Sequence, residues 1–359
     1  MKVLLLSTPV GPLGSGLGGG VELTLTNIAK ALVIRGHLVQ IIAPKGSHFE
    51  AGGGIEVDGA LQQTAQAQGR DAPITLPGDS VLEKMWACAR IWQQEVDVII
   101  NFAYDWLPFY LTPWFDRPIA HLVSMGSLTD AMDTVIGQTV QHFPGTVGVH
   151  SRAQAATFGF GDRLRCLSNG LDLSHYAFQS QPDRALAWVG RIAPEKGIED
   201  AIAATNQAQI PLRIFGVQPD PAYWQRVCQQ YPQAPIEYRG FLPTEQLQQE
   251  LGRCLGLVMT PRWVEAFGNV AIEALACGVP VVAYRRGGPA EIVQDGATGW
   301  LVEPDSVAGL VEAIARLPII DRRTCRQQAE ANYSLEAMGN RVEQWLNDIL
   351  VDSPKGQNE

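Results

Sequence analysis

Short runs of apolar residues alternate with amphipathic stretches along most of the chain, and this alternation predicts an α/β fold with parallel sheets. Continuous apolar runs are typical of parallel strands that are buried on both faces. We expect such strands at residues 3–7, 39–43, 96–101, 118–121, 146–150, 187–189, 212–216, 236–242, 256–260 and 281–284.

Amphipathic helices are expected between these strands. The helix after the first strand places Leu25, Ile28 and Leu32 on one stripe and ends at Gly36, so it would pack on the sheet. Residues 81–92 and 246–254 also have helical character, and residues 334–350 form an amphipathic helix before a frayed tail. Residues 46–80 have no clean periodicity, which predicts irregular loops with short strands.

The length of the chain predicts two domains. A chain of 359 residues is too long for one ordinary core and fits two α/β domains, which implies a cleft. We expect an N-terminal domain at residues 1–172, a C-terminal domain at residues 173–333 and a terminal helical segment at residues 334–359.

The most informative stretch is residues 260–284. Glu265 lies in a loop before a helix, Glu273 falls on the second turn of that helix, and Gly268 lies between them. Helix N-termini carry unpaired N–H donors and the positive end of the helix dipole, so a diphosphate is a suitable ligand there. The backbone donors would come from Phe267, Gly268, Asn269 and Val270.

A basic turn opens the second predicted domain. Arg191 and Lys196 stand in Gly-Arg-x-x-x-x-Lys-Gly, directly after an apolar strand and within an acidic chain. An arginine offers a bidentate fork and a lysine a mobile point charge, which together suit pyrophosphate oxygens. Solvated surface cations are the alternative interpretation of the pair.

The two glutamates with seven residues between them, and the Gly-Arg-x-x-x-x-Lys-Gly segment, resemble the retaining glycosyltransferases of family 4. The resemblance implies the GT-B fold, with two Rossmann-like domains and a C-terminal helix that returns to the first domain. It also implies a nucleotide-sugar donor, a diphosphate leaving group and attack from the face of departure. The family keeps a histidine near the transferred sugar, and the resemblance implies that His121 has this role here.

The resemblance also implies donor-site roles for individual residues. Glu273 would hold the ribose hydroxyls and Glu265 the sugar hydroxyls. Gly20, in a second glycine-rich helix start, would meet the diphosphate, while Phe241 and Leu242 would hold uracil through their backbone.

The glycine-rich loop near the N-terminus suggests a different class of enzyme. Gly14, Gly16 and Gly19 formally satisfy G-x-G-x-x-G, which would indicate an NAD-dependent oxidoreductase. The glycines begin too far after the strand, and the next strand ends in Pro44-Lys45 instead of the acid that would hold a ribose. We therefore disfavour a dinucleotide site.

An acceptor site is expected at Tyr104, Asp105 and Trp106, because ligands of open α/β sheets bind at the carboxyl ends of strands. Residues 7–16, 69–77 and 101–113 resemble the pterin-glucosylating members of the family. That implies transfer of glucose from UDP-glucose to the side-chain hydroxyl of tetrahydrobiopterin or a related pterin. Another small acceptor, a lipid, or sugar-nucleotide binding without turnover are the alternatives; a lipid acceptor would need a basic, apolar patch on the first domain, which we do not find.

The composition of the chain argues against several classes of binding partner. The formal net charge of −10 and the lack of Lys and Arg clusters argue against nucleic acid and anionic membranes. Six cysteines stand singly and no long apolar segment occurs, so we expect a soluble, cytoplasmic protein without stable membrane insertion. No Asp-x-Asp pair occurs, so no cofactor or metal is expected to be required.

Overall fold

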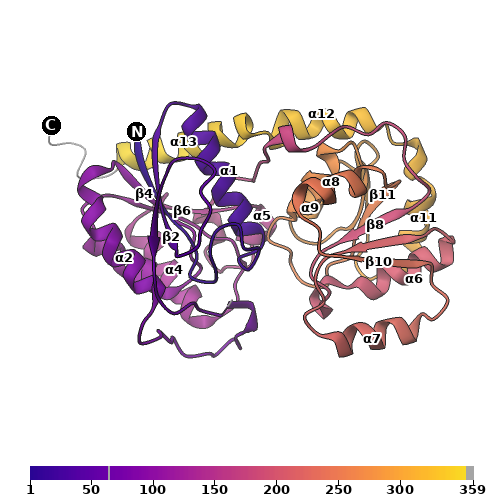
Figure 1. The fold of residues 1–359 in the computed structure, drawn as a ribbon, viewed down its shortest axis with the longest axis horizontal. Coiled ribbons are helices and arrows are strands. Elements are labelled where there is room, and N and C mark those ends of the chain that lie inside the picture. Colours follow the sequence, from indigo (N-terminus) through magenta and orange to yellow (C-terminus); the bar gives the residue numbers. More distant parts are fainter. Residues whose placement is uncertain (64, 353–359) are drawn as a thin grey trace. The chain divides into compact units, whose positions relative to one another are not determined.

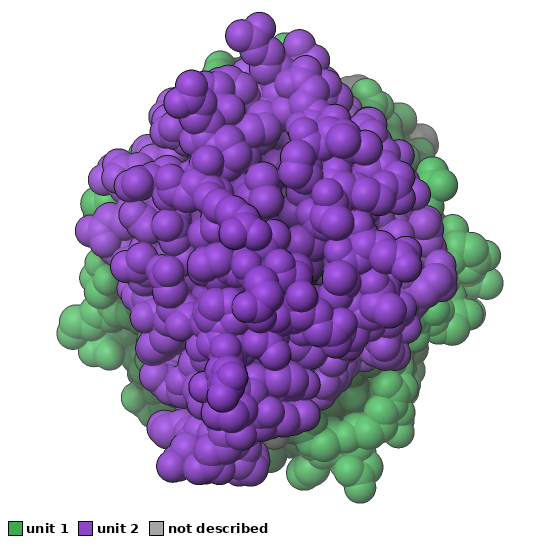
Figure 2. Space-filling view, turned by 90° about the vertical axis from the view of Figure 1, so that its right-hand side faces the viewer, with its two compact units in different colours: residues 1–170, 335–359 green, residues 171–334 purple. Residues whose placement is uncertain are grey.

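The computed structural model describes residues 1–63 and 65–352, which form two compact units. Unit 1 consists of residues 1–170 and the C-terminal segment from Leu335, and unit 2 consists of Leu171–Ser334 (Figures 1 and 2). The predicted frayed tail, residues 353–359, lies outside the described residues.

Unit 1 is built on a parallel sheet with the strand order β3-β2-β1-β4-β5-β6-β7. The strands are β1 Lys2–Leu6, β2 Leu38–Pro44, β3 Gly53–Val57, β4 Val98–Asn101, β5 Ile119–Leu122, β6 Val147–Val149 and β7 Arg165–Cys166. The central strand β1 is apolar at every position after Lys2, because helices cover both faces of the sheet.

Helices of unit 1 divide between the two faces. They are α1 Gly20–Ile34, α2 Val81–Trp92, α3 Trp106–Leu111, α4 Asp130–His142, α5 Arg152–Ala155 and α13 Leu335–Asp352. Side chains alternate along β1, so Leu5 joins the core beneath α1 and α13, whereas Leu4 joins the core beneath α2. Short 3-10 turns lie at Ala65–Ala67, Gln93–Glu95, Thr112–Trp114 and Gly161–Arg163.

The C-terminal helix α13 packs on unit 1, as the sequence implied. Its apolar stripe joins the core formed with α1, and Trp345 is 1% exposed. The Trp345 indole Nε1 donates to the carbonyl oxygen of Gly145 at 2.7 Å. A buried indole of this kind removes a large apolar area from water while its single polar atom stays paired.

Unit 2 has a second parallel sheet, with the order β10-β9-β8-β11-β12-β13. Its strands are β8 Leu186–Val189, β9 Leu212–Phe215, β10 Ile236–Gly240, β11 Gly256–Met259, β12 Val281–Tyr284 and β13 Gly299–Val302. Its helices are α6 Ile198–Ala208, α7 Pro221–Gln230, α8 Thr244–Gly252, α9 Asn269–Ala276, α10 Pro289–Ile292, α11 Val307–Ala315 and α12 Arg322–Tyr333, with 3-10 turns at Leu173–His175, Pro194–Lys196 and Leu317–Ile319.

The fold class predicted from the sequence is confirmed in both units: parallel sheets covered by helices, with α2 found at the predicted residues 81–92. Loops after neighbouring parallel strands leave at the same edge, where α/β proteins place their sites. Among the described residues, no helix combines the length and apolar character needed to cross a membrane.

Candidate active site

The turn after β8 in unit 2 carries Arg191 and Lys196. It closes with the 3-10 turn Pro194–Lys196 and with Gly197 at φ 62°. A Cβ on Gly197 would lie 2.1 Å from the carbonyl oxygen of Thr260, so only glycine fits. This close approach holds the lysine turn against the chain that follows β11.

Lys196 and Glu265 meet although 69 residues separate them. Nζ of Lys196 donates to Oε2 of Glu265, and Nε1 of Trp263 donates to the same oxygen at 3.0 Å. The ammonium also lies 5.1 Å from the centroid of the Trp263 ring. The structure thus brings together the cation expected for the diphosphate and the carboxylate expected for the sugar.

Arg191 has a carboxylate partner from its own turn. Its Nη2 donates to Oε1 of Glu195 at 2.5 Å, and both side chains remain about one-third exposed. Each of the two cations is therefore paired with a glutamate. A diphosphate would replace glutamate oxygens with phosphate oxygens on the same cations.

Two glycines clamp the backbone of Glu265. The N–H of Gly288 donates to the Glu265 carbonyl oxygen at 2.7 Å. Gly287 adopts φ 69°, and a Cβ there would lie 2.5 Å from both N and O of Glu265. The Gly287-Gly288 pair therefore positions the Glu265 loop by direct backbone packing.

Helix α9 begins where the sequence predicted. Its N-cap is Gly268 at φ 95°, and Asn269 and Val270 form the first turn. Phe267 is buried and packs edge-on against Tyr333, with ring centroids 6.2 Å apart. The start of α9, with the positive end of its helix dipole, therefore follows directly after Glu265.

Glu273 projects from α9 as a mostly buried carboxylate. Desolvation raises the pKa of Glu273 to about 7. Burial of the Tyr176 phenol is the main cause that raises the pKa of Tyr176, and the charge of Glu273 is the second cause. Glu273 is therefore poised to gain from a ligand that donates hydrogen bonds to it.

Replacing Glu273 with glutamine should stabilise the protein at pH 8 by about 1–3 kcal/mol. The folded-state pKa of about 7 is raised above the ordinary value of 4.5. The carboxyl group therefore contributes its full stability below that ordinary value and loses it as the pH rises through 7. Urea unfolding at pH 5 and pH 8 measures this: the variant should gain at pH 8 and little at pH 5, and equal changes at both would refute the assignment.

Phe241 and Leu242 follow β10 on a loop that begins at Gly240, φ 74°. Phe241 is 64% exposed. The structure places both residues at the carboxyl edge of the unit 2 sheet, the same edge as Arg191 and Lys196, and no hydrogen bond among the described residues joins them to the Lys196–Glu265 pair.

In unit 1, Gly20 is the first residue of α1, after Gly19 at φ 61°. The glycine loop before it folds back on Glu22. The N–H groups of Gly14, Gly16 and Gly18 donate to the Glu22 carboxylate at 2.8, 3.1 and 2.5 Å. Glu22 thus serves as an internal anion for this loop, a role the sequence did not reveal.

Replacing Glu22 with glutamine should destabilise the protein by about 1–3 kcal/mol, because charge-assisted bonds to three backbone donors are lost. Thermal unfolding and proteolysis of residues 11–19 measure the effect. Glu56, exposed on β3, provides the matched control, and Glu56→Gln should leave both unchanged. Equal behaviour of the two variants would contradict this role of Glu22.

The structure corrects the expectation for His121, which was predicted to contact the transferred sugar. His121 lies within β5, is 0% exposed, and stacks on Phe109 with ring centroids 4.2 Å apart. Its Nδ1 lies 3.2 Å from Nδ2 of Asn101, and its Nε2 lies 2.9 Å from Oγ1 of Thr112. Burial lowers the pKa of His121 to about 3, so it is a neutral, structural side chain.

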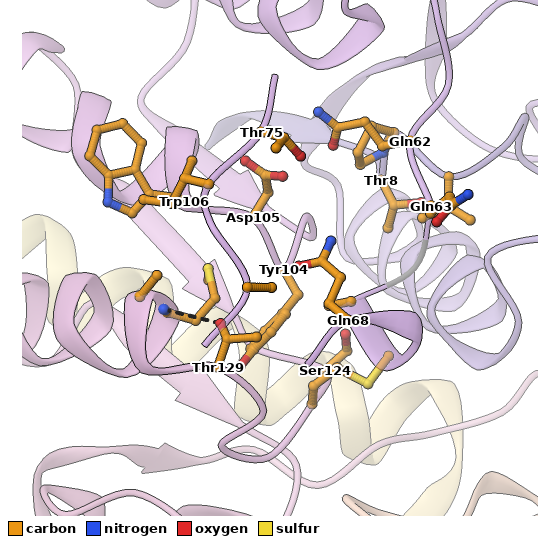
Figure 3. Close-up of a pocket in the computed structure, with 18 of the residues that line it drawn as sticks. Thr8, Gln62, Gln63, Gln68, Thr75, Tyr104, Asp105, Trp106, Ser124 and Thr129 are labelled. Atoms are coloured by element: carbon orange, nitrogen blue, oxygen red, sulfur yellow. Dashed lines mark hydrogen bonds between the residues drawn. The ribbon is translucent and has the colours of Figure 1, made fainter. Parts of the chain in front are cut away.

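A pocket lies at the carboxyl edge of the unit 1 sheet (Figure 3). Tyr104, Asp105 and Trp106, the residues expected at an acceptor site, all line this pocket. Its open space is ≈ 850 Å³, including part that is continuous with solvent. Trp106 stacks on Tyr110 with ring centroids 4.4 Å apart, which fixes one aromatic wall.

Several pocket residues were missed from the sequence. They come from the aperiodic region 46–80 and from the loop after β5, and they are Gln62, Gln63, Gln68, Thr75, Ser124 and Thr129. Ser124 lies three residues beyond His121, where the chain has left the sheet. The only sequence signal was that this loop follows a predicted strand. Among the described residues, no group of three or more His, Cys, Asp or Glu side chains could hold a metal ion.

Unit 2 matches a known sequence family, and both units together match known structures. Residues 178–335, nearly all of unit 2, match the family model described as glycosyl transferases group 1. The whole chain superposes on AviGT4, a glycosyltransferase involved in avilamycin A biosynthesis, with a TM-score of 0.73, 19% identity and coverage of 98% of this chain and 99% of that one. The fold is GT-B. HepE of Anabaena, solved in complex with UDP-glucose, gives a TM-score of 0.74 at 20% identity. The match covers 97% of this chain and 100% of that one.

Curated relatives overlap this GT-B chain only in part. An exopolysaccharide phosphotransferase of Streptomyces coelicolor is 33% identical over 43% of this chain and 17% of its own length. D-inositol 3-phosphate glycosyltransferase 2 of Catenulispora acidiphila is 30% identical over 62% of this chain and 58% of its own length. The chain thus spans less than two thirds of both. The similarity to glycosyl transferases group 1 therefore covers residues 178–335, and the similarity to both relatives is partial.

Proposed function

We propose that this GT-B chain is a retaining glycosyltransferase that moves glucose from UDP-glucose to a side-chain hydroxyl of tetrahydrobiopterin or a related pterin. The observation that carries the donor half is the Lys196–Glu265 pair beside the glycine-clamped start of α9. A cation, a carboxylate and helix N–H donors within one short region match a diphosphate next to a sugar.

In this proposal Lys196 and Arg191 bind the diphosphate oxygens, and Glu265 accepts hydrogen bonds from sugar hydroxyls. Glu273 accepts from the ribose, and the backbone at Phe241 and Leu242 holds uracil. The bond between the anomeric carbon and the diphosphate oxygen breaks, and the acceptor oxygen bonds to the same face of that carbon. The hydroxyl proton passes to the departing oxygen, whose growing charge the two cations stabilise.

The acceptor half is supported by the make-up of the unit 1 pocket. The three segments that resemble pterin-glucosylating enzymes, residues 7–16, 69–77 and 101–113, each contribute to its wall, for example through Thr8, Thr75 and Tyr104. Segments far apart in sequence therefore meet where an acceptor would bind. The aromatic side chains among them suit a flat ring.

UDP release from UDP-glucose, measured with and without tetrahydrobiopterin in the presence of a metal chelator, tests the proposal. We expect release that requires the pterin and that the chelator does not change. UDP-glucose binding without an effect of the pterin would leave the donor site and reject this acceptor, in favour of another small acceptor. Binding without turnover on any acceptor would favour a nucleotide-sugar-binding protein.

A further inference from the structure

Among the described residues, a single charged side chain lines the unit 1 pocket. Its other lining residues are apolar, aromatic, amide or hydroxyl side chains, and no Lys, Arg or His is among them. A pocket without a cation has nothing to neutralise an acceptor phosphate or carboxylate. Its one charge, Asp105, instead requires a partner that donates hydrogen bonds.

Asp105 has unused hydrogen-bonding capacity. Its Oδ1 accepts from the N–H of Leu107 at 3.0 Å, whereas Oδ2 has no hydrogen-bond partner among the described residues. A carboxylate can accept about four hydrogen bonds, so both oxygens remain available to a ligand. Figure 3 shows the carboxylate directed into the pocket, on the side of Thr75.

The hydroxyl of the neighbouring Tyr104, in contrast, already has hydrogen-bond partners. Its hydroxyl donates to the carbonyl oxygen of Gly126 at 3.1 Å and accepts from the N–H of Leu128 at 3.4 Å. Its phenol oxygen is therefore occupied, and the ring is the part it can offer. Asp105 is left as the charged anchor beside an aromatic surface.

We propose that Asp105 is the residue that recognises the pterin ring, accepting two parallel hydrogen bonds from its adjacent ring N–H and exocyclic amino group. This inference rests on the proposed pterin acceptor. A 2-amino-4-oxo pteridine presents these two donors side by side, the spacing a carboxylate fork matches. Burial raises the pKa of Asp105, so the ionised form gains from such a partner.

The pairing also orients the acceptor. The dihydroxypropyl side chain lies at the end of the pteridine opposite to the amino group. With the amino edge on Asp105, the side-chain hydroxyls point away from this carboxylate, which leaves them free to attack a sugar. Asp105 therefore selects the ring and positions it without touching the reacting atoms.

The test compares two acceptors that carry the same dihydroxypropyl side chain: tetrahydrobiopterin, and its analogue with a carbonyl in place of the amino group. Wild-type protein should prefer the amino compound at least about tenfold in kcat/KM, because the analogue leaves an acceptor facing Asp105. Asp105→Asn keeps the oxygen that caps Leu107 but offers an NH₂ to the ring. It should raise the KM for tetrahydrobiopterin about 10–100-fold and reduce or invert the preference, with an unchanged KM for UDP-glucose.

Asp162→Asn, at an exposed carboxylate of unit 1, serves as the control and should change neither value. The comparison of the two acceptors with wild-type protein tests the role of Asp105 even if the Asp105→Asn variant does not fold. If wild-type protein glucosylates both acceptors equally well, or if Asp105→Asn keeps the wild-type KM and preference, the role of Asp105 is overturned while the pterin acceptor stands. If neither acceptor is glucosylated, both proposals fall.

Discussion

Lys196→Ala should lower kcat/KM for UDP-glucose by about 10²–10³, the loss typical of removing one preorganised group that stabilises transition-state charge. Lys196 is the only lysine of unit 2, so no neighbouring lysine can replace it. Its removal also takes the ion-pair partner from Glu265 and leaves that carboxylate uncompensated where we propose that the diphosphate binds. UDP affinity should fall in parallel, measured by calorimetry.

A matched control distinguishes this effect from general loss of charge. Lys45 forms an exposed ion pair with Asp58, and its removal should leave both kcat/KM and UDP affinity unchanged. If Lys196→Ala retains wild-type UDP affinity, the lysine does not bind the diphosphate. The donor site would then have to lie elsewhere.

Gly287→Ala should impair both stability and turnover. Its Cβ would lie 2.5 Å from the Glu265 backbone, and its φ of 69° already disfavours other residues. We expect a loss of more than about 2 kcal/mol and a large drop in kcat, because the Glu265 loop must shift. Urea unfolding and UDP release measure the two effects.

Gly296→Ala provides the comparison in the same unit. Gly296 has a similar φ of 79°, but its nearest neighbours are Trp300 ring atoms at 3.5 and 3.6 Å, an ordinary contact distance. This variant should lose only about 1 kcal/mol and retain turnover. Equal losses in the two variants would mean that backbone conformation, and not the clash with Glu265, determines the effect.

The difference between the predicted and observed sites has a physical cause. Apolar runs located ten of the thirteen described strands, missing β3, β7 and β13, and the motif around Gly268 located α9, because both signals are local. His121 was misplaced because β5 continues to Leu122 and its register pairs His121 with Asn101 and Val147, inside the sheet. A sequence pattern does not show which residue of a strand is the last one covered.

The pocket wall from residues 62–75 could not be predicted for a different reason. Its described lining residues come from irregular backbone, so no periodicity marks them in the sequence. The turn of the glycine loop onto Glu22 belongs to the same class, since the donors lie four to eight residues from the acceptor in irregular backbone. The segments singled out in the sequence, residues 7–16 and 69–77, include part of these two regions but not residues 62–68, and they did not reveal the contacts.

The most direct test of the central claim is the identity of the product formed from UDP-glucose and tetrahydrobiopterin, determined by mass spectrometry and NMR. We predict one glucose, α-linked to a side-chain oxygen of the pterin, for each UDP released. A β-linked product would contradict retention, and free glucose with unmodified pterin would contradict the acceptor.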